Sequence, residues 1–329
     1  MRRRDFITLM GSAAAAWPLA ARAQQAGMKR VSVLSPEAPD DPNVEVRLVI
    51  FQQELERLGW QQERNVHIDY RYASGKFDQY AVLARELVAS QPDAILAWST
   101  QVAATLKRET RTIPIVFNNV SDPIGAGFVS SLARPDGNLT GILLFETGIM
   151  GKWLAMLKEI SPGLTRVALL DNPKTSPFDY FKQSAEAAVP SLGIELVPTP
   201  VDNDKAEIER AINGFAATPH GGLVVVPDPT PLIQRDVVIA LAERDRLPAV
   251  YPLRAFMDAG GLMYYGTDQL DLFRLSARYI DRILRGAKPA DLPVQAPTKF
   301  ETIVNLRSAK AMGLTVPPSL LVRADEVIE

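Results

Sequence analysis

The sequence predicts an α/β protein with two doubly wound, Rossmann-like lobes, whose parallel sheets are joined by a hinge of several strands. Three observations support this fold class. The chain has 329 residues, which is enough for two domains. Short β-branched runs alternate with longer amphipathic segments, as in βαβ units. This alternating series occurs twice, on either side of a segment rich in glycine and proline.

Residues 1–23 have the features of an export signal peptide. Three arginines at positions 2–4 precede an uncharged stretch at 6–21, and Ala21-Arg22-Ala23 has the small-x-small pattern of a cleavage site. The string Arg3-Arg4-Asp5-Phe6-Ile7 resembles a twin-arginine signal, although the general secretory route stays open. The apolar run is shorter than the about 20 residues of a membrane anchor. We therefore expect an exported, periplasmic chain that starts near Gln24.

Composition excludes several classes of function. Without residues 1–23 the chain carries 32 Lys and Arg against 37 Asp and Glu, a net charge of −5. A nucleic-acid partner is therefore not expected, because it requires a basic face. The absence of cysteine excludes disulfides, thiolate metal sites and a lipoprotein anchor. With 2 histidines, the sequence predicts no metal site and no cofactor.

The first series predicts four strands and three helices. The helix at 46–58 illustrates the pattern, because apolar residues recur on one face, charged residues lie between them, and Gly59 follows as a C-cap. The segment at 118–141 is expected to be irregular. The predicted strands lie at 31–34, 66–70, 94–97 and 114–117, and the other helices at 77–89 and 101–111.

The second series repeats this order, and the remaining segments are expected to cross between the lobes. Its predicted helices lie at 151–160, 178–189, 204–216 and 233–245, and its strands at 166–171, 194–197, 222–226 and 249–251. A later helix at 270–284 should return to the first lobe, and a strand at 302–306 to the second. We therefore expect an N-terminal lobe of 28–145 plus about 266–290, and a C-terminal lobe of 146–265 plus about 291–329.

A search for catalytic groups finds none. His67 lies in a predicted strand and His220 in a turn rich in glycine and proline. The chain after residue 23 has no nucleophile elbow, no zinc-protease motif and no P-loop. Gly125-Ala-Gly127 resembles the start of a dinucleotide fingerprint, but nothing completes it, so we expect a turn.

Binding residues are expected at the carboxyl ends of the strands, where ligands of open α/β sheets lie. In the first lobe these ends carry short polar groups and one tryptophan: Ser35, Trp98, Ser99, Thr100, Asn119, Ser121 and Asp122. Hydroxyls and N–H groups at a helix N-terminus suit a carboxylate. Ser99 and Thr100 could equally be a plain N-cap, and Trp98 could line a pocket or fill the core.

The second lobe offers a carboxylate and aromatic rings at the corresponding positions. The candidates are Asn172, Asp228, Tyr251 and Tyr265. A carboxylate facing the cleft could bind a ligand ammonium, and the rings could enclose an apolar side chain. The alternative for Asp171 and Asp228 is that each caps the helix that follows.

From Met28 to Glu329 the chain resembles the substrate-binding proteins of ABC transporters, in particular uncharacterised relatives of the tryptophan-associated binding protein. The resemblance rests on ordered blocks: 113–117 (Ile-Pro-Ile-Val-Phe), Asp122-Pro123, 131–135 (Ser-Leu-Ala-Arg-Pro), Gly137-Asn138, Thr140-Gly141, 260–263 (Gly-Gly-Leu-Met), Tyr265-Gly266, 284–293, 297–301, 317–321 and 324–329.

The resemblance implies a type I periplasmic-binding-protein fold and a protein that presents a small molecule to an inner-membrane ABC permease, without chemistry of its own. Family members suggest an amino-acid ligand, with aromatic amino acids among the candidates. We also expect a monomer. The chain departs from the family at 97–100 (Ala-Trp-Ser-Thr) and Asn118-Asn119, where smaller residues are usual. A periplasmic sensor subunit is the alternative function, and a periplasmic hydrolase is a third one.

Overall fold

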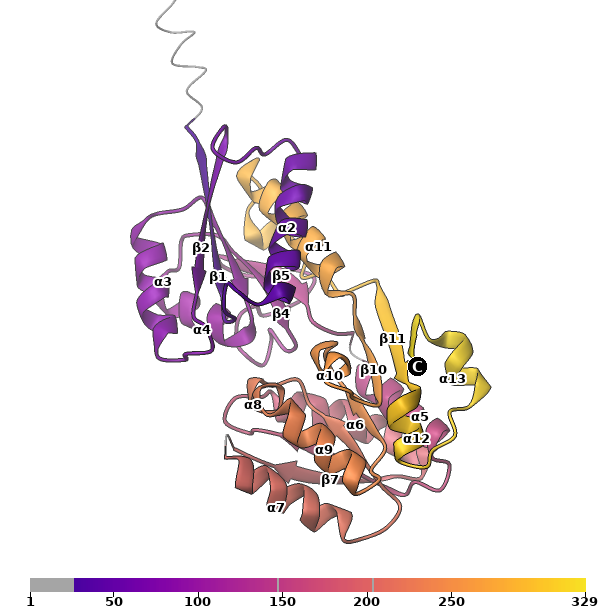
Figure 1. Cartoon of the computed structure of the whole chain (residues 1–329). Helices are drawn as coiled ribbons and strands as arrows, with labels where there is room; N and C mark the ends of the chain where they lie inside the picture. Colours follow the sequence, from indigo (N-terminus) through magenta and orange to yellow (C-terminus); the bar gives the residue numbers. More distant parts are fainter. Residues whose placement is uncertain (1–26, 147, 203) are drawn as a thin grey trace, which may run out of the picture.

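The computed structural model describes residues 27–329 apart from 147 and 203. The predicted export signal at 1–23 and the predicted start near Gln24 lie outside these residues. Two lobes lie end to end, and the chain crosses between them three times (Figure 1). Among the described residues, no helix has both the length and the apolar character that a membrane crossing requires.

The first lobe contains a five-stranded parallel sheet in the order β2-β1-β3-β4-β5. Its strands are β1 (Lys29–Ser35), β2 (Val66–Tyr72), β3 (Ala94–Trp98), β4 (Ile115–Val120) and β5 (Leu139–Leu143), and its helices are α2 (Pro42–Arg57), α3 (Gln79–Ala89) and α4 (Thr100–Glu109). The prediction of four strands was wrong. The fifth strand, β5, is a buried apolar run within the glycine-rich segment that we expected to be irregular, and it pairs in parallel with β4.

The second lobe contains a seven-stranded sheet in the order β12-β11-β10-β9-β8-β6-β7, in which β10 and β11 are antiparallel. Its strands are β6 (Arg166–Asp171), β7 (Glu195–Pro200), β8 (Gly221–Val225), β9 (Ala249–Tyr251), β10 (Met263–Thr267), β11 (Phe300–Asn305) and β12 (Glu326–Ile328). Its helices are α5 (Ile149–Ile160), α6 (Phe178–Leu192), α7 (Lys205–Ala216), α8 (Pro229–Ile233), α9 (Arg235–Arg244), α10 (Ala255–Asp258), α12 (Leu306–Ala311) and α13 (Pro318–Arg323).

Two further expectations for the second lobe were incomplete. The predicted helix at 233–245 is preceded by α8, which starts at Pro229 because Asp228 caps it and proline suits the first helical position. The sequence pattern also missed β12, a short edge strand paired with β11. The predicted fold class is nevertheless confirmed, because the structure is an α/β fold with two sheets of mostly parallel strands.

Strands β3, β4 and β5 of the first sheet are buried on both faces, which explains their apolar runs. Val31, Val33 and Leu96 point to the core beneath α2 and α11 (Gln269–Leu284), whereas Leu34 and Ile95 point to the core beneath α3 and α4. Side chains alternate between the two cores because successive strand residues face opposite sides of the sheet.

The three crossings between the lobes run side by side. The end of β5 contacts the segment that follows the short helix η1 (Pro289–Asp291), because the N–H of Leu143 donates to the carbonyl of Gln295 at 2.9 Å. The crossing from β10 into α11 is tied to the same region, since the N–H of Asp268 donates to the carbonyl of Lys299 at 3.0 Å.

Helix α11 lies against α2 in the first lobe (Figure 1), where Arg278 pairs with Glu54 at 2.7 Å. The strands β10, β11 and β12 lie in the second sheet. We retain the sequence-based lobe boundaries, near 145, 266 and 290, as a proposal.

Candidate functional site

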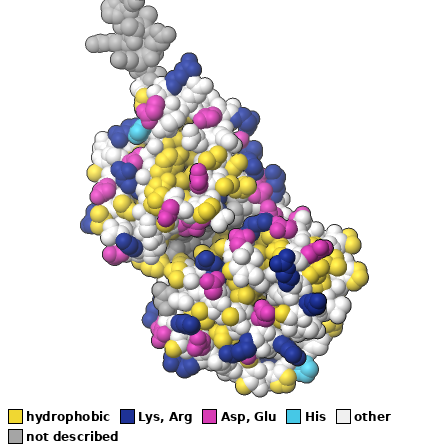
Figure 2. All heavy atoms as spheres, in the orientation of Figure 1, with side chains coloured by type: hydrophobic (Ala, Val, Ile, Leu, Met, Phe, Trp, Pro, Cys, Tyr) yellow, Lys and Arg dark blue, Asp and Glu magenta, His cyan; other side chains and the backbone are white. Residues whose placement is uncertain are grey.

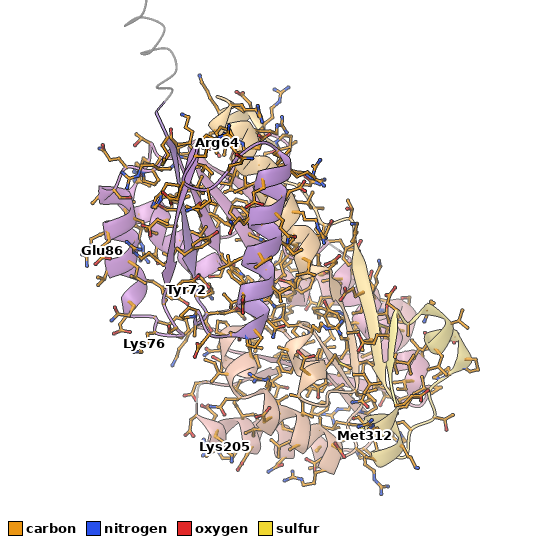
Figure 3. All side chains as sticks on the ribbon, turned by 45° about the horizontal axis from the view of Figure 1, so that its top comes forward. Arg64, Tyr72, Lys76, Glu86, Lys205 and Met312 are labelled. Carbon is orange, nitrogen blue, oxygen red and sulfur yellow. The ribbon has the colours of Figure 1, made fainter. Side chains whose placement is uncertain are left out.

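Side chains of both lobes line a cavity of about 210 Å³ at the carboxyl ends of the strands. In Figure 3, Tyr72 and Lys76, at and after the end of β2, lie on the side of the first lobe that is nearest the second, whereas Arg64, before β2, lies on the opposite side. Hydrophobic side chains reach the surface of both lobes beside the waist between them (Figure 2). Ligands of open α/β sheets bind at this edge.

The lining is mostly apolar, with a few polar groups. The first lobe and hinge contribute Pro36, Glu37, Gly75, Phe77, Tyr80, Trp98, Ser99, Thr100, Gln101, Asn119, Ser121 and Leu144, and the second lobe contributes Thr175, Pro177, Pro227, Asp228, Pro229, Leu232, Ile233 and Leu253. Among these, the acidic side chains are Glu37 and Asp228, and none is Lys, Arg or His.

The turn from β3 into α4 brings a helix N-terminus to the cavity. The hydroxyl of Ser99 accepts the N–H of Val102 at 3.3 Å, so Ser99 is the N-cap of a helix that starts at Thr100. Ser99 has φ 134° and ψ 164°, a backbone region almost restricted to glycine. This conformation starts the helix directly after the buried strand. The N–H groups of its first turn and the hydroxyl of Thr100 can therefore bind an anionic group.

The next strand, β4, carries a second unusual backbone position at the same level. Trp98 and Asn118 are register partners, so Ser99 and Asn119 hold equivalent places. Asn119 has φ 58°, and the pairing of β4 with β5 shifts at this point. A bulge of this kind re-aims side chains. The Nδ2 atom of Asn119 donates to Oε1 of Gln269 at 3.0 Å, and its Oδ1 is buried without a hydrogen-bond partner.

Trp98 is both a core residue and a wall of the cavity. It is 1% exposed and packs edge-to-face on Phe273, with ring centroids 4.5 Å apart. The guanidinium of Arg47 lies 5.3 Å from the centre of the Trp98 ring and pairs with Glu37 at 3.1 Å. Trp98 therefore fills the core and lines the cavity at the same time.

In the second lobe, Asp228 combines capping with a free oxygen. Its Oδ1 accepts the N–H of Thr230 at 2.8 Å as the N-cap of α8, whereas its Oδ2 is buried and has no hydrogen-bond partner. Burial raises the pKa of Asp228, and Thr175 and Thr230 oppose that shift. An unpaired buried carboxylate oxygen is costly, so this atom requires a donor.

A second carboxylate, Asp171, lies close behind Asp228. Burial raises the pKa of Asp171 to about 6, the hydroxyl of Ser176 opposes that shift, and the charge of Asp228 adds to it. The hydroxyl of Ser176 donates to Oδ2 of Asp171 at 2.9 Å. Asp171 thus adds negative potential behind the wall of the cavity without lining it.

Three predicted residues of the second lobe and hinge do not line the cavity. Nδ2 of Asn172 donates to Oγ1 of Thr230 at 2.9 Å, which ties the loop after β6 to α8. Tyr251 stacks on Phe256 in the core of the second lobe, with centroids 4.9 Å apart. Tyr265 stacks on Phe300 of the neighbouring strand, and its hydroxyl accepts a hydrogen bond from Lys152 at 2.7 Å.

Two predicted residues of the first lobe also lie off the cavity. Ser35 is completely buried, and its hydroxyl accepts the N–H of Glu37 at 3.1 Å. Oδ1 of Asp122 accepts the N–H of Gly125 at 2.8 Å, which closes the turn expected at Gly125-Ala-Gly127. The predicted residues that do line the cavity are Trp98, Ser99, Thr100, Asn119, Ser121 and Asp228.

The sequence reasoning missed several apolar lining residues. Phe77 and Tyr80 follow the edge strand β2, and Leu232 and Ile233 lie on α8. The usable signal was position, because each follows the carboxyl end of a strand. The described residues contain no group of three or more His, Asp or Glu side chains that could hold a metal ion.

Residues 42–328 match the family model described as ABC transporter substrate binding protein. A tyrosine-binding protein of Clostridioides difficile (strain R20291) is 24% identical over 270 residues, which cover 80% of this chain and 75% of that protein.

Solved structures share the fold. An ABC domain from Streptococcus pneumonia in complex with L-Trp has a TM-score of 0.82 at 24% identity, covering 91% of this chain and 99% of the other. A ligand-free, open substrate-binding protein with adhesive properties from Clostridium difficile has a TM-score of 0.72 at 22% identity, with the same coverage of 91% and 99%.

Proposed function

The chain belongs to the family of ABC transporter substrate-binding proteins, and from this premise we propose that it is the periplasmic component of an importer that closes its lobes on an aromatic amino acid. We further propose that it releases this ligand unchanged to a permease in the inner membrane. The arginines, apolar run and cleavage pattern of residues 1–23 support export. The family supports the partner.

One observation carries the ligand assignment: Asp228, whose buried Oδ2 has no hydrogen-bond partner, lines the same cavity as the N-terminus of α4. An α-amino acid has a cation and an anion on adjacent atoms. Its ammonium would donate to Asp228, and its carboxylate would bind Thr100 and the N–H groups that open α4. The two lobes would then hold opposite ends of one zwitterion.

The rest of the lining supports an aromatic side chain. Trp98, Phe77 and Tyr80 come from the first lobe, and Pro229 and Leu253 from the second. Rings bury large apolar area against such walls. The relatives described as tyrosine-binding and as a complex with L-Trp agree with this ligand class.

The exposed apolar side chains at the cavity favour closure of the two lobes. Phe77 is 43% exposed in the first lobe and Ile233 is 52% exposed in the second, and both line the cavity. A ligand that contacts both lobes binds the closed state more tightly than the open one, so it shifts the population toward closure. Burial of these two side chains adds to that preference.

The test is calorimetric titration of residues 24–329 with tryptophan, tyrosine and phenylalanine, using wild type and Asp228→Asn. Asparagine still caps α8 but lacks the charge, so we expect affinity to fall about 10- to 100-fold, as for a charged hydrogen bond. Asp204→Asn is the matched control, because Asp204 caps α7 in the same way, with Oδ1 2.9 Å from the nitrogen of Ala206. Equal affinities of all three proteins would refute the role of Asp228.

A further inference from the structure

We infer that Asn119, oriented by Gln269, selects ligands whose side chain carries a hydrogen-bond donor. This inference rests on the proposed function, because it concerns the side chain of an amino-acid ligand. It assigns a role to a residue that lines the cavity, and it defines the substrate class as tryptophan or tyrosine in preference to phenylalanine.

Two residues that line the cavity each have an oxygen atom without a hydrogen-bond donor. Asp228 Oδ2 and Asn119 Oδ1 are both buried, lack a hydrogen-bond partner and belong to residues that line the cavity. They come from opposite lobes. Each is a hydrogen-bond acceptor, and a buried acceptor without a donor costs free energy. A ligand that closes the lobes should therefore supply a donor to each of them.

A hydrogen bond to Gln269 orients the side-chain amide of Asn119. Nδ2 donates to Oε1 of Gln269 at 3.0 Å, so the amide nitrogen is engaged toward the start of α11. The remaining atom, Oδ1, is the one left to meet a ligand. The left-handed φ of 58° at Asn119 and the irregular pairing of β4 fix the position from which this side chain projects.

The groups of an aromatic amino acid differ in whether they can bind Oδ1 of Asn119. A carboxylate is repelled by an amide oxygen and has the N-terminus of α4 available. The ammonium has the carboxylate of Asp228. The donor that remains on an aromatic amino acid is the indole N–H or the phenol O–H, and phenylalanine has neither. A site built to bind such a group discriminates strongly against the analogue that lacks it.

The experiment measures affinities in two matched ligand pairs, tyrosine against phenylalanine and tryptophan against 3-benzothienylalanine, in which sulfur replaces the indole N–H. We expect wild type to prefer the donor-bearing member of each pair by about tenfold or more. Asn119→Gly should reduce the affinity ratio of each pair to near one, because glycine adopts a positive φ freely but has no side-chain amide.

Two variants of Gln269 test the orienting role. Gln269→Glu offers only acceptors, so it should hold Nδ2 and keep the preference. Gln269→Lys offers only donors, so it should turn the amide and bring Nδ2 into the cavity, which removes or reverses the preference. A merely structural role of Gln269 would change all four affinities together.

Each remaining outcome is decisive. Ratios near one in wild type, or ratios unchanged in Asn119→Gly, overturn the inference and leave the proposed function intact. An equal loss for all four ligands in Asn119→Gly also overturns it, because Asn119 would then bind the common ammonium or carboxylate. Failure of wild type to bind any of the four refutes the proposed function together with this inference.

Discussion

The backbone of Ser99 predicts that replacing this residue with glycine raises stability, although the change removes a helix cap. With φ 134° and ψ 164°, Ser99 occupies a region in which a residue with a Cβ is strained by about 1–3 kcal/mol. Glycine as N-cap costs only about a few tenths of a kcal/mol relative to serine. The freedom that glycine gains in the unfolded chain costs about 0.5–1 kcal/mol. The balance favours Ser99→Gly by about 1 kcal/mol.

The assay is urea unfolding and thermal melting of wild type, Ser99→Gly and Ser99→Ala. A gain of about 1 kcal/mol corresponds to a rise in Tm of about 2 °C in a chain of this size. Alanine keeps the strain and loses the bond to Val102, so it should be about 1 kcal/mol less stable than wild type. If glycine destabilises the protein as much as alanine does, Ser99 is not strained and this reasoning is wrong.

Three further substitutions test the second lobe and the first sheet. Because burial raises the pKa of Asp171 to about 6, the folded chain holds this proton more tightly than the unfolded chain, and wild-type stability should fall as pH rises from about 4 to 6. Asp171→Asn should therefore be more stable above pH 6, by roughly 3 kcal/mol. This difference should be lost near pH 4 in urea unfolding, and a difference independent of pH would contradict the reasoning. Gly141→Ala would put a Cβ 2.1 Å from the carbonyl oxygen of Phe117 and should cost about 1–3 kcal/mol or more. Gly214→Ala, with nothing within 4 Å, should gain about 0.5–1 kcal/mol, and equal melting of these two variants would refute the packing argument.

Regular elements were predictable where the local pattern and the tertiary environment agree. The strand at 166–171 is a buried apolar run that ends in a polar residue, and its predicted and observed bounds coincide. Strand β5 was missed because its five residues include Gly141, which has to be glycine since β4 approaches so closely. The close approach of β4 depends on the tertiary structure, so the sequence alone could not show why a glycine is required at this position.

The sequence predicted which residues lie at the carboxyl ends of strands, but not which of their side chains line the cavity. Trp98 and Asp228 were expected at carboxyl ends of strands, and both line the cavity. Tyr251 also ends a strand, but its ring packs between helix and sheet in the core of the second lobe. Alternation along a strand sends neighbouring side chains to opposite faces, and the sequence does not say which face meets the other lobe.

Strain distinguishes the cavity from the other turns. Within the described part of the chain, the other non-glycine residues with positive φ are Glu63, Ser74, Gln91, His220 and Arg246, which are exposed and have φ of 49° to 62°. Ser99 departs furthest from these values, and Asn119, with an ordinary left-handed φ, is half-buried.

Both positions follow register partners on adjacent strands and line the cavity. Strained backbone persists only where the surrounding structure holds it, and it concentrates at binding sites. Here Trp98 and Asn118 are buried register partners, and the residues that follow them, Ser99 and Asn119, both line the cavity. Replacing Ser99 with glycine should thus raise stability by relieving strain, and replacing Asn119 with glycine should lower selectivity by removing the amide, which separates the two roles experimentally.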